Sequence, residues 1–92
     1  MATVFIPTPL RQFVDGQDAV HADGATVDEV LLSLVEQHTA LKNQLFDDQD
    51  RLRRFVNIYL NDEDIRYLQK GDTAVQEADE VSIVPAIAGG YY

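Results

Sequence analysis

The sequence closes with Val81-Ser-Ile-Val-Pro-Ala-Ile-Ala-Gly-Gly-Tyr-Tyr92, and the rest of the chain is organised around this stretch. Its first part, residues 81–85, is apolar and rich in β-branched side chains, which predicts a short buried strand. Residues 86–92 carry no turn signal and end in a diglycine followed by two aromatics. Because ordering glycine costs more backbone entropy than ordering any other residue, we expect this tail to be flexible.

The diglycine Gly89-Gly90 gives the tail a specific capacity. With no Cβ on either residue, the backbone can enter a narrow channel and bring the Gly90 carbonyl against the active site of another protein. We therefore interpret the tail as a substrate for partner proteins. The alternative is a frayed terminus whose glycines have no function, and the rest of the sequence has to decide between the two.

Composition limits the possible classes of protein. The chain has 92 residues and no cysteine, which suits one domain at residues 1–85 followed by the tail at 86–92 and excludes a disulfide framework or a thiolate nucleophile. No stretch approaches the roughly 20 apolar residues of a membrane span, and the start lacks a signal-peptide pattern. We expect a soluble, cytoplasmic protein without a membrane partner.

The charge balance points in the same direction. Sixteen acidic and seven basic side chains give a formal net charge of −9. This sign repels phosphate backbones and anionic lipids, so we expect no nucleic-acid partner. The acidity would steer a basic protein partner toward the chain, or it serves only to keep a small domain soluble.

The beginning of the sequence predicts a hairpin. Residues 3–6 form a β-branched and aromatic run closed by Pro7-Thr-Pro9, and residues 18–22 form a weaker second strand after a turn at Gly16. His21 lies alone in this strand, without neighbours at ligand spacing. We interpret it as an ordinary surface or half-buried histidine.

A helix follows the hairpin. Thr26-Val-Asp-Glu29 matches a capping box, in which the hydroxyl and the carboxylate satisfy free amides at the helix start. Side chains then recur at helical spacing along one face: Val27, Val30, Leu31, Leu34, Val35 and His38. A short second helical turn is predicted around Leu41 and Leu45.

The segment Phe55-Val-Asn-Ile-Tyr-Leu60 is the strongest strand pattern in the chain. Alternation places Val56, Ile58 and Leu60 toward the helix, and Phe55, Asn57 and Tyr59 on the opposite face. On the closing strand, the same reasoning turns Val81, Ile83 and Pro85 inward and Ser82 and Val84 outward. We expect Phe55, Tyr59 and Val84 to form an apolar docking face for a partner, the alternative being that they merely cover the sheet.

Two acidic runs, Asp47-Asp-Gln-Asp50 and Asp62-Glu-Asp64, are interpreted as solvated loops. Neither has the glycine and terminal glutamate of a calcium loop, and a general acid needs a carboxylate held in a pocket that shifts its pKa. No serine or cysteine has a plausible histidine base, and no glycine-rich phosphate loop is present. The chain is therefore expected not to be an enzyme and to bind no cofactor or metal.

The predicted order is strand, strand, long helix, strand, short irregular elements, strand. A C-terminal strand that pairs back into the sheet of an N-terminal hairpin, with one helix across it, describes an α+β β-grasp, the ubiquitin-like fold. We expect a mixed sheet of four to five strands, with the closing strand beside the first and the tail projecting from one end.

Three stretches together resemble the MoaD/ThiS family of sulfur carriers, most closely the CysO-type carriers of cysteine biosynthesis. They are Phe5-Ile-Pro-Thr-Pro-Leu-Arg11, Arg54-Phe-Val-Asn-Ile-Tyr-Leu-Asn-Asp-Glu-Asp-Ile-Arg66 and Val81-Ser-Ile-Val-Pro-Ala-Ile-Ala-Gly-Gly90. The resemblance implies a β-grasp and carboxyl chemistry on Gly90. A ubiquitin-activating-like enzyme would adenylate that carboxylate with ATP, and sulfur would displace AMP to leave a thiocarboxylate. The acceptor of a CysO-type carrier is an activated serine at a pyridoxal-phosphate cysteine synthase.

The sequence departs from the family pattern after the diglycine. With Tyr91 attached, Gly90 has no free carboxylate to adenylate, so the chain is interpreted as a precursor cleaved between these two residues. The expected processor is a zinc metalloprotease of the JAMM type. Ala86, Ile87 and Ala88 would join Phe55, Tyr59 and Val84 in contacting partners.

Three other interpretations remain open from the sequence. The first is the small subunit of molybdopterin synthase, whose tail inserts into a catalytic subunit. The second is a protein modifier that is joined through Gly90 to a lysine of a target, as ubiquitin is. The last alternative is a β-grasp interaction module with an inert tail.

Overall fold

A computed structural model of the chain describes residues 1–54, 56–87 and 90–91. The first half of the chain forms a hairpin and the helices, in this order: β1 (Ala2–Phe5), η1 (Thr8–Val14), β2 (Ala19–Ala22), α1 (Val27–Gln37), η2 (Thr39–Leu41) and α2 (Lys42–Leu45). The second half supplies the remaining strands and two short 3-10 helices: β3 (Val56–Leu60), β4 (Glu63–Asp64), η3 (Ile65–Tyr67), η4 (Lys70–Asp72), β5 (Glu80–Ile87) and β6 (Gly90–Tyr91).

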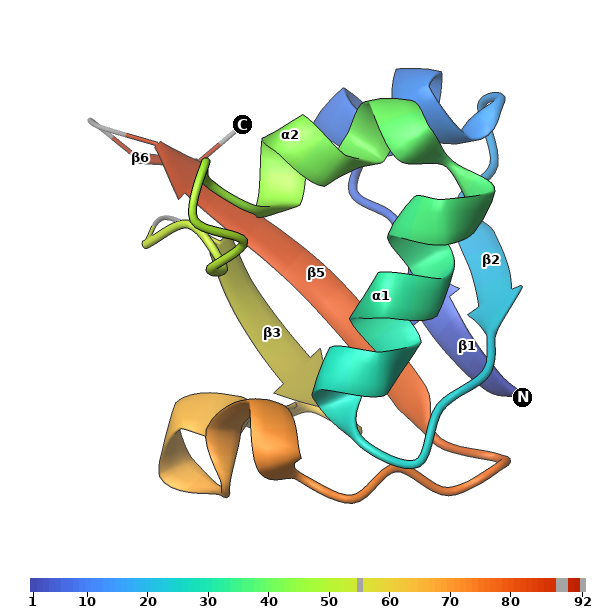
Figure 1. Ribbon diagram of the computed structural model, residues 1–92, viewed down its shortest axis with the longest axis vertical. Helices are drawn as coiled ribbons and strands as arrows, with labels where there is room; N and C mark the ends of the chain where they lie inside the picture. Colours follow the sequence, from blue (N-terminus) through green and yellow to red (C-terminus); the bar gives the residue numbers. More distant parts are fainter. Residues whose placement is uncertain (55, 88–89, 92) are drawn as a thin grey trace.

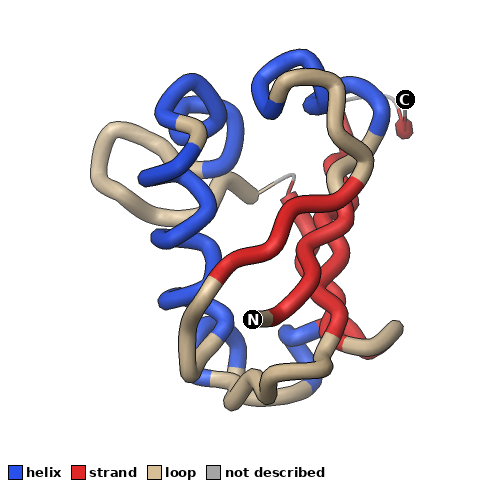
Figure 2. The backbone as a smooth tube through the Cα atoms, turned by 90° about the vertical axis from the view of Figure 1, so that its right-hand side faces the viewer, coloured by secondary structure: helices blue, strands red, loops and turns tan. Residues whose placement is uncertain are grey.

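The closing strand lies in the middle of the sheet. The strand order is β2-β1-β5-β3-β4, and β6 pairs with β5 off this path. β5 is parallel to β1, with Val81 opposite Val4, and antiparallel to β3, with Ile83 opposite Ile58. α1 crosses one face of this sheet (Figure 1), and Figure 2 shows the helix and the strands as two layers. The predicted mixed sheet, the predicted helix and the β-grasp fold are confirmed.

The core lies between α1 and the sheet, as the apolar patterns predict. Five side chains of α1 are buried: Val27, Val30, Leu31, Leu34 and Val35. The inward residues of the two central strands are buried as well, and Asn57, Tyr59, Ser82 and Val84 between them are half-buried. Period-two alternation in strands and 3.6-residue periodicity in helices therefore locate the core faces correctly.

The capping box at the start of α1 is confirmed. The Thr26 hydroxyl accepts a hydrogen bond from the Glu29 amide at 3.3 Å. The Glu29 carboxylate accepts one from the amide of Ala25 at 3.0 Å, one residue before the cap. Both contacts satisfy amides that the first helical turn leaves free, so the helix starts where the sequence indicates.

The connection between β1 and β2 is longer than a simple turn. It contains the 3-10 helix η1, in which Leu10 and Val14 are buried, and Gly16 follows with φ of 78°. Pro9 lies in the first turn of η1, where its missing N–H removes no helical hydrogen bond. Sequence reasoning interpreted the proline pair only as the end of a strand and missed the buried i, i+4 pair behind it.

One expectation about the acidic runs is wrong. Asp64 was expected to be solvated, but it is buried and forms an ion pair with Arg66. Asp64 belongs to the short strand β4, which pairs with Tyr59 and Leu60 of β3. The turn between the two strands contains Asn61 and Asp62, both with a left-handed φ. The tight turn folds the last acid of the run back against the sheet, where hydrogen bonds replace its hydration.

Candidate functional site

The site is built on the end of β5, where the chain leaves the sheet. Because β5 runs parallel to β1, its C-terminal end lies at the opposite end of the sheet from Met1 (Figure 1). Pro85 is the last residue with a described side chain; it is buried and lies opposite Val56. The strand continues to Ile87, two residues past the expected end of the domain.

The backbone of the tail pairs with β5. β6 is antiparallel to β5, with Ala86 opposite Tyr91 and Ile87 opposite Gly90. The cleavage expected between Gly90 and Tyr91 therefore falls within β6. Four residues that the sequence analysis singles out lie outside the described residues: Phe55, Ala88, Gly89 and Tyr92. The flexibility of the tail stays a prediction.

An apolar face lies on the side of the sheet away from α1. The strand register sets Ser82 opposite both Phe5 and Tyr59, and Val84 opposite Asn57. Tyr59 and Val84 are half-buried, whereas the Phe5 side chain is 40% exposed. The structure thus brings two of the predicted docking residues together and adds Phe5. We call Phe5, Tyr59 and Val84 the outer face.

Sequence reasoning missed Phe5 although a signal was present. Val4 and Ile6 are buried, so alternation within β1 already turns Phe5 outward. Alternation alone does not say which strand lies next to β1, and so it cannot join Phe5 to the other two residues. Only the parallel pairing of β1 with β5 brings them together.

A groove of about 500 Å³ runs beside the last described part of β5. It is lined by Pro7, by the first half of η1 and by β5: Pro7, Thr8, Pro9, Arg11, Ile83, Val84 and Pro85. Arg11 is fixed by a hydrogen bond from its Nε to the Ile6 carbonyl at 3.0 Å. This groove continues the outer face toward the tail and offers a partner a rigid, mostly apolar surface with one guanidinium.

The aspartates whose pKa values are shifted accept hydrogen bonds that stabilise turns. Hydrogen bonds from the Arg51 and Gln49 amides lower the pKa of Asp47, and those from the Gln76 amide and the Asn61 side chain lower the pKa of Asp79. The Arg66 side chain, followed by its amide, lowers the pKa of Asp64. A general acid at neutral pH requires a raised pKa, so these carboxylates act in structure.

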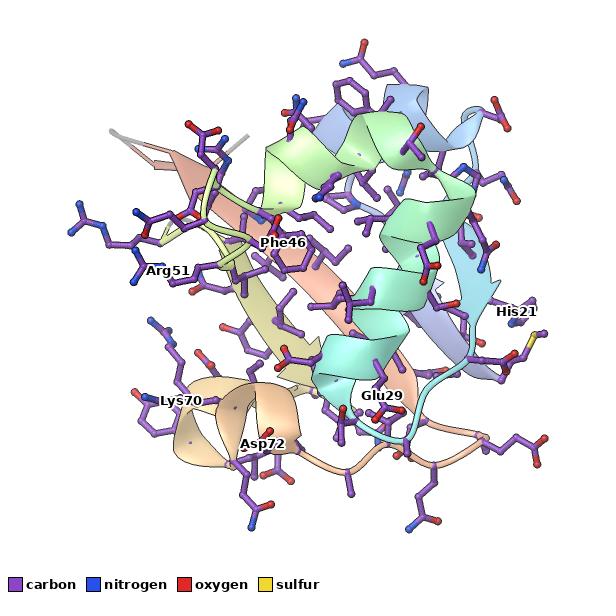
Figure 3. The ribbon with its side chains drawn as sticks, in the orientation of Figure 1. His21, Glu29, Phe46, Arg51, Lys70 and Asp72 are labelled. Carbon is purple, nitrogen blue, oxygen red and sulfur yellow. The ribbon has the colours of Figure 1, made fainter. Side chains whose placement is uncertain are left out.

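The histidines and acids form no metal centre in the part of the chain that the structure describes. His21 is exposed on β2, with its Nδ1 at 3.3 Å from the Thr3 hydroxyl (Figure 3). No group of three histidine or acidic side chains comes together among the described residues. Across the same residues, no helix has the length and apolarity that a membrane crossing requires.

Comparison with known proteins finds relatives that match nearly the whole chain. Residues 4–90 match the ThiS family. The sulfur carrier protein CysO of Mycobacterium tuberculosis is 43% identical over 90 residues, which cover 96% of this chain and 97% of that protein. Its crystal structure has a TM-score of 0.85. The small archaeal modifier protein 3 of Haloferax volcanii is 34% identical over 80 residues, covering 84% of this chain and 86% of that protein.

A related structure contains a partner. A chain in the crystal structure of the Amycolatopsis orientalis BexX/CysO complex is 40% identical and has a TM-score of 0.88, covering 98% of this chain and all of that chain. A protein with this fold is therefore known to form a complex with another protein. The match covers nearly the whole β-grasp of this chain, including the segments that build the outer face and the groove.

Proposed function

The chain belongs to the ThiS family, and on this basis we propose that it is a sulfur carrier that holds sulfur as a thiocarboxylate on Gly90. One observation carries the proposal: the family match spans residues 4–90 and ends at the second glycine, leaving Tyr91 and Tyr92 outside it. The similarity to CysO supports the carrier role. The curated relatives are carriers or modifiers by name, so the chain is not an enzyme.

The proposed chemistry begins with processing. A protease of the JAMM type hydrolyses the peptide bond between Gly90 and Tyr91 and releases the two tyrosines, which leaves a carboxylate on Gly90. An activating enzyme of the ubiquitin-activating kind then joins this carboxylate to the α-phosphate of ATP and releases pyrophosphate. A sulfide equivalent attacks the acyl carbonyl, AMP departs, and the thiocarboxylate remains.

The chain's own residues provide access and docking in this scheme. Gly90 presents its carbonyl without a side chain, so a narrow active site can close around the backbone. The outer face and the groove provide a rigid apolar surface beside the strand that leads to the tail. We place the carrier in the cytoplasm, where ATP is available, and no cofactor is bound apart from the sulfur it carries.

The proposed sulfur acceptor follows from the similarity to CysO. A thiocarboxylate sulfur is a soft nucleophile, and in cysteine biosynthesis it would attack an activated serine held by a pyridoxal-phosphate cysteine synthase. The sulfur bonds to the serine β-carbon in place of the activated hydroxyl group, which departs. Hydrolysis of the resulting thioester then frees cysteine and the Gly90 carboxylate. This chain has no thiol that would compete with that reaction.

A second function is favoured by a specific similarity. The match to a small archaeal modifier protein supports a modifier function, in which Gly90 is joined to a lysine of a target protein. The same activation step serves both functions, because an acyl adenylate reacts with a sulfur or, through further transfer, with an amine. The two functions differ only in the product.

The test is the intact mass of the purified chain after incubation with an extract of its own cells, ATP and sulfide. We expect loss of Tyr91 and Tyr92, followed by the mass increase of replacing one oxygen with sulfur. A Gly90→Val chain serves as the matched control and should remain uncleaved or unactivated, because its side chain blocks close approach to the carbonyl.

The other outcomes separate the alternatives. Cleavage without the sulfur increase, together with diglycine remnants on lysines of other proteins, would favour a modifier. An unchanged chain in an extract that matures a related carrier would contradict both functions. That result would leave a β-grasp interaction module.

A further inference from the structure

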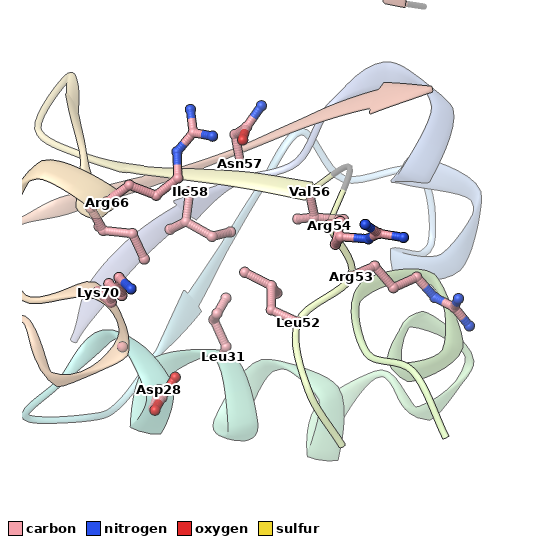
Figure 4. Close-up of a pocket in the computed structure, with 12 residues that line it drawn as sticks. Asp28, Leu31, Leu52, Arg53, Arg54, Val56, Asn57, Ile58, Arg66 and Lys70 are labelled. Carbon is pink, nitrogen blue, oxygen red and sulfur yellow. The ribbon is translucent and has the colours of Figure 1, made fainter. Parts of the chain in front are cut away.

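A larger cleft opens along the edge of β3. Its volume is about 770 Å³, and α1, the segment before β3, β3 itself, η3 and η4 surround it (Figure 4). Its floor consists of aliphatic side chains from these elements: Leu31, Leu52, Val56, Ile58 and Ile65. We call it the β3-edge cleft. Among the described residues, none lines both this cleft and the groove beside β5.

The rim of the β3-edge cleft is cationic in a strongly acidic protein. Four of the chain's seven lysines and arginines line it: Arg53, Arg54, Arg66 and Lys70. Arg66 is partly neutralised by Asp64, and the Nε of Arg53 donates to the Asn43 carbonyl at 2.9 Å. Asp28 is the acidic side chain in the lining. Figure 4 shows Arg54 and Lys70 toward opposite ends of the cleft.

Part of the β3 backbone is available along this cleft. β4 pairs with β3 only through Tyr59 and Leu60. Within the described part of the chain, no strand pairs with the outward-facing backbone groups of Val56 and Ile58, which both line the cleft. The Val56 amide already donates to the Arg53 carbonyl at 3.0 Å, so Ile58 supplies the N–H that this edge offers. A strand edge presents unpaired N–H and C=O groups, which are a template for another extended chain.

We propose that the β3-edge cleft binds an extended, acidic segment of a partner protein, which adds a short strand to β3 at Ile58. The backbone of the segment pairs with the free edge, and its alternate side chains fall on opposite sides. Apolar side chains on one side cover the aliphatic floor. Acidic side chains on the other contact Arg54 and Lys70.

The charge distribution explains why an acidic segment would choose this place. The remaining surface carries nearly all of the sixteen acids, and it repels an acidic partner. Local cations therefore fix where and in which orientation the segment docks, which is the main contribution of charge complementarity at an interface. The free strand edge favours a peptide over a small anion, because a small anion has no backbone that could pair with the strand.

The probe is a synthetic peptide of alternating valine and glutamate, titrated into the full ¹⁵N-labelled chain and followed by NMR. We expect saturable shifts at Val56, Asn57 and Ile58, and slower amide exchange at Ile58, whose N–H faces the outer edge. Lys70→Glu should weaken binding by about tenfold. The matched control is Lys42→Glu, which makes the same charge change outside the cleft and should leave binding unchanged.

Two further peptides test the strand addition. A peptide with lysine in place of glutamate should not bind. A glutamate peptide that is N-methylated on the residues facing β3 cannot donate along that edge and should lose binding, whereas N-methylation of the alternate residues should be tolerated. If Lys70→Glu fails to give a folded spectrum, Arg54→Glu replaces it, because Arg54 lies exposed in the segment before β3.

The following results would overturn the proposal. Shifts that do not saturate, or that lie away from β3, would remove the site. Equal binding of both N-methylated peptides would show attraction by charge alone. Displacement of the peptide by inorganic phosphate at similar concentration would show a site for small anions. None of these results depends on the tail, so they leave the carrier function untouched.

Discussion

Asp64 is the carboxylate whose surroundings differ most from those of a solvated acid. Its Oδ1 accepts from the Arg66 amide at 2.9 Å, and its Oδ2 accepts from the Arg66 Nη2 at 2.6 Å. The guanidinium, followed by the amide, lowers the pKa of Asp64. The same side chain caps η3, so one residue joins β4 to the helix that borders the β3-edge cleft.

This arrangement predicts a pH dependence of stability. Because the pKa of Asp64 is lower in the folded chain than in the unfolded chain, its contribution is fully present above a pH of about 4. It is lost as the pH falls through the folded-state pKa. We expect Asp64→Asn to lower the free energy of unfolding at pH 7, with a difference from the parent chain that shrinks at acidic pH.

Urea denaturation at a series of pH values measures this difference. Asp48→Asn is the matched control, since Asp48 is exposed and makes no hydrogen bond or ion pair with the other described residues. If the difference in the free energy of unfolding between the parent chain and Asp64→Asn stayed constant down to the lowest pH measured, the assigned role of the ion pair with Arg66 would be wrong.

Gly24 gives a second prediction at the scale of a single residue. A Cβ placed there would lie 2.5 Å from the Val30 amide nitrogen and 2.8 Å from the Glu29 carbonyl carbon. Since backbone atoms of α1 cannot move aside cheaply, Gly24→Ala should destabilise the chain by about 1–3 kcal/mol. Thermal unfolding measures the effect.

Gly16→Ala is the comparison for Gly24→Ala. Gly16 has a left-handed φ of 78° but no atom within 4 Å of an added Cβ. Its substitution should therefore cost only the backbone strain of about 1 kcal/mol. If Gly16→Ala proved the more damaging of the two, the close approach of Gly24 to the helix would be wrong.

At the scale of one element, α1 depends on its first turn and on its buried face. Asp28 and Glu29 lie near the positive end of the helix, and the capping box satisfies two amides there. The last turn has no basic side chain. Local polar contacts therefore stabilise the start of α1, and packing of its apolar face against the sheet stabilises the rest.

Removing the cap tests the first of these contributions. Thr26→Ala should lower the free energy of unfolding by about 1 kcal/mol, because the Glu29 amide loses its partner. Thr39→Ala, at an exposed threonine whose hydroxyl makes no hydrogen bond within the described residues, should have a much smaller effect. Chemical denaturation of both variants gives the comparison, and equal losses would count against the cap.

At the scale of the whole molecule, the sheet brings distant segments together on the face away from α1. β1 supplies Phe5, β3 supplies Tyr59 and β5 supplies Val84, and β5 then leads into the tail. A partner that reacts with the tail can therefore hold this rigid face at the same time. Docking on this face reduces the entropy that is lost when the tail enters an active site.

The outer face gives the prediction that belongs to this scale. Replacing both Tyr59 and Val84 by glutamate should reduce thiocarboxylate formation on the matured chain by at least tenfold, because two charges interrupt the apolar contact. The yield is read by intact mass with the activating enzyme, and circular dichroism checks that the variant is folded. Replacing exposed Gln12 and Gln17 by glutamate is the charge-matched control.

A folded double variant with an unchanged yield would exclude the outer face from the activation step. Because Val84 also lines the groove beside β5, the same result would count against that groove as well.

The amino-acid sequence by itself determined the features that depend on near neighbours. The capping box located the start of α1, and alternation oriented β3 and β5. Each of these signals follows from backbone geometry over a few residues. The sequence order of the elements was also sufficient for the β-grasp, because few topologies allow a closing strand to pair beside the first.

Only the tertiary structure decided which side chains meet. The neighbours of Phe5, the groove behind Pro9, the burial of Asp64 and the cations around the β3-edge cleft all depend on strand register and on turns that bring distant segments together. Acidic residues in a polar run look alike in sequence whether a turn exposes or buries them. Contact between distant residues is set by the packing of the whole chain, which no local pattern encodes.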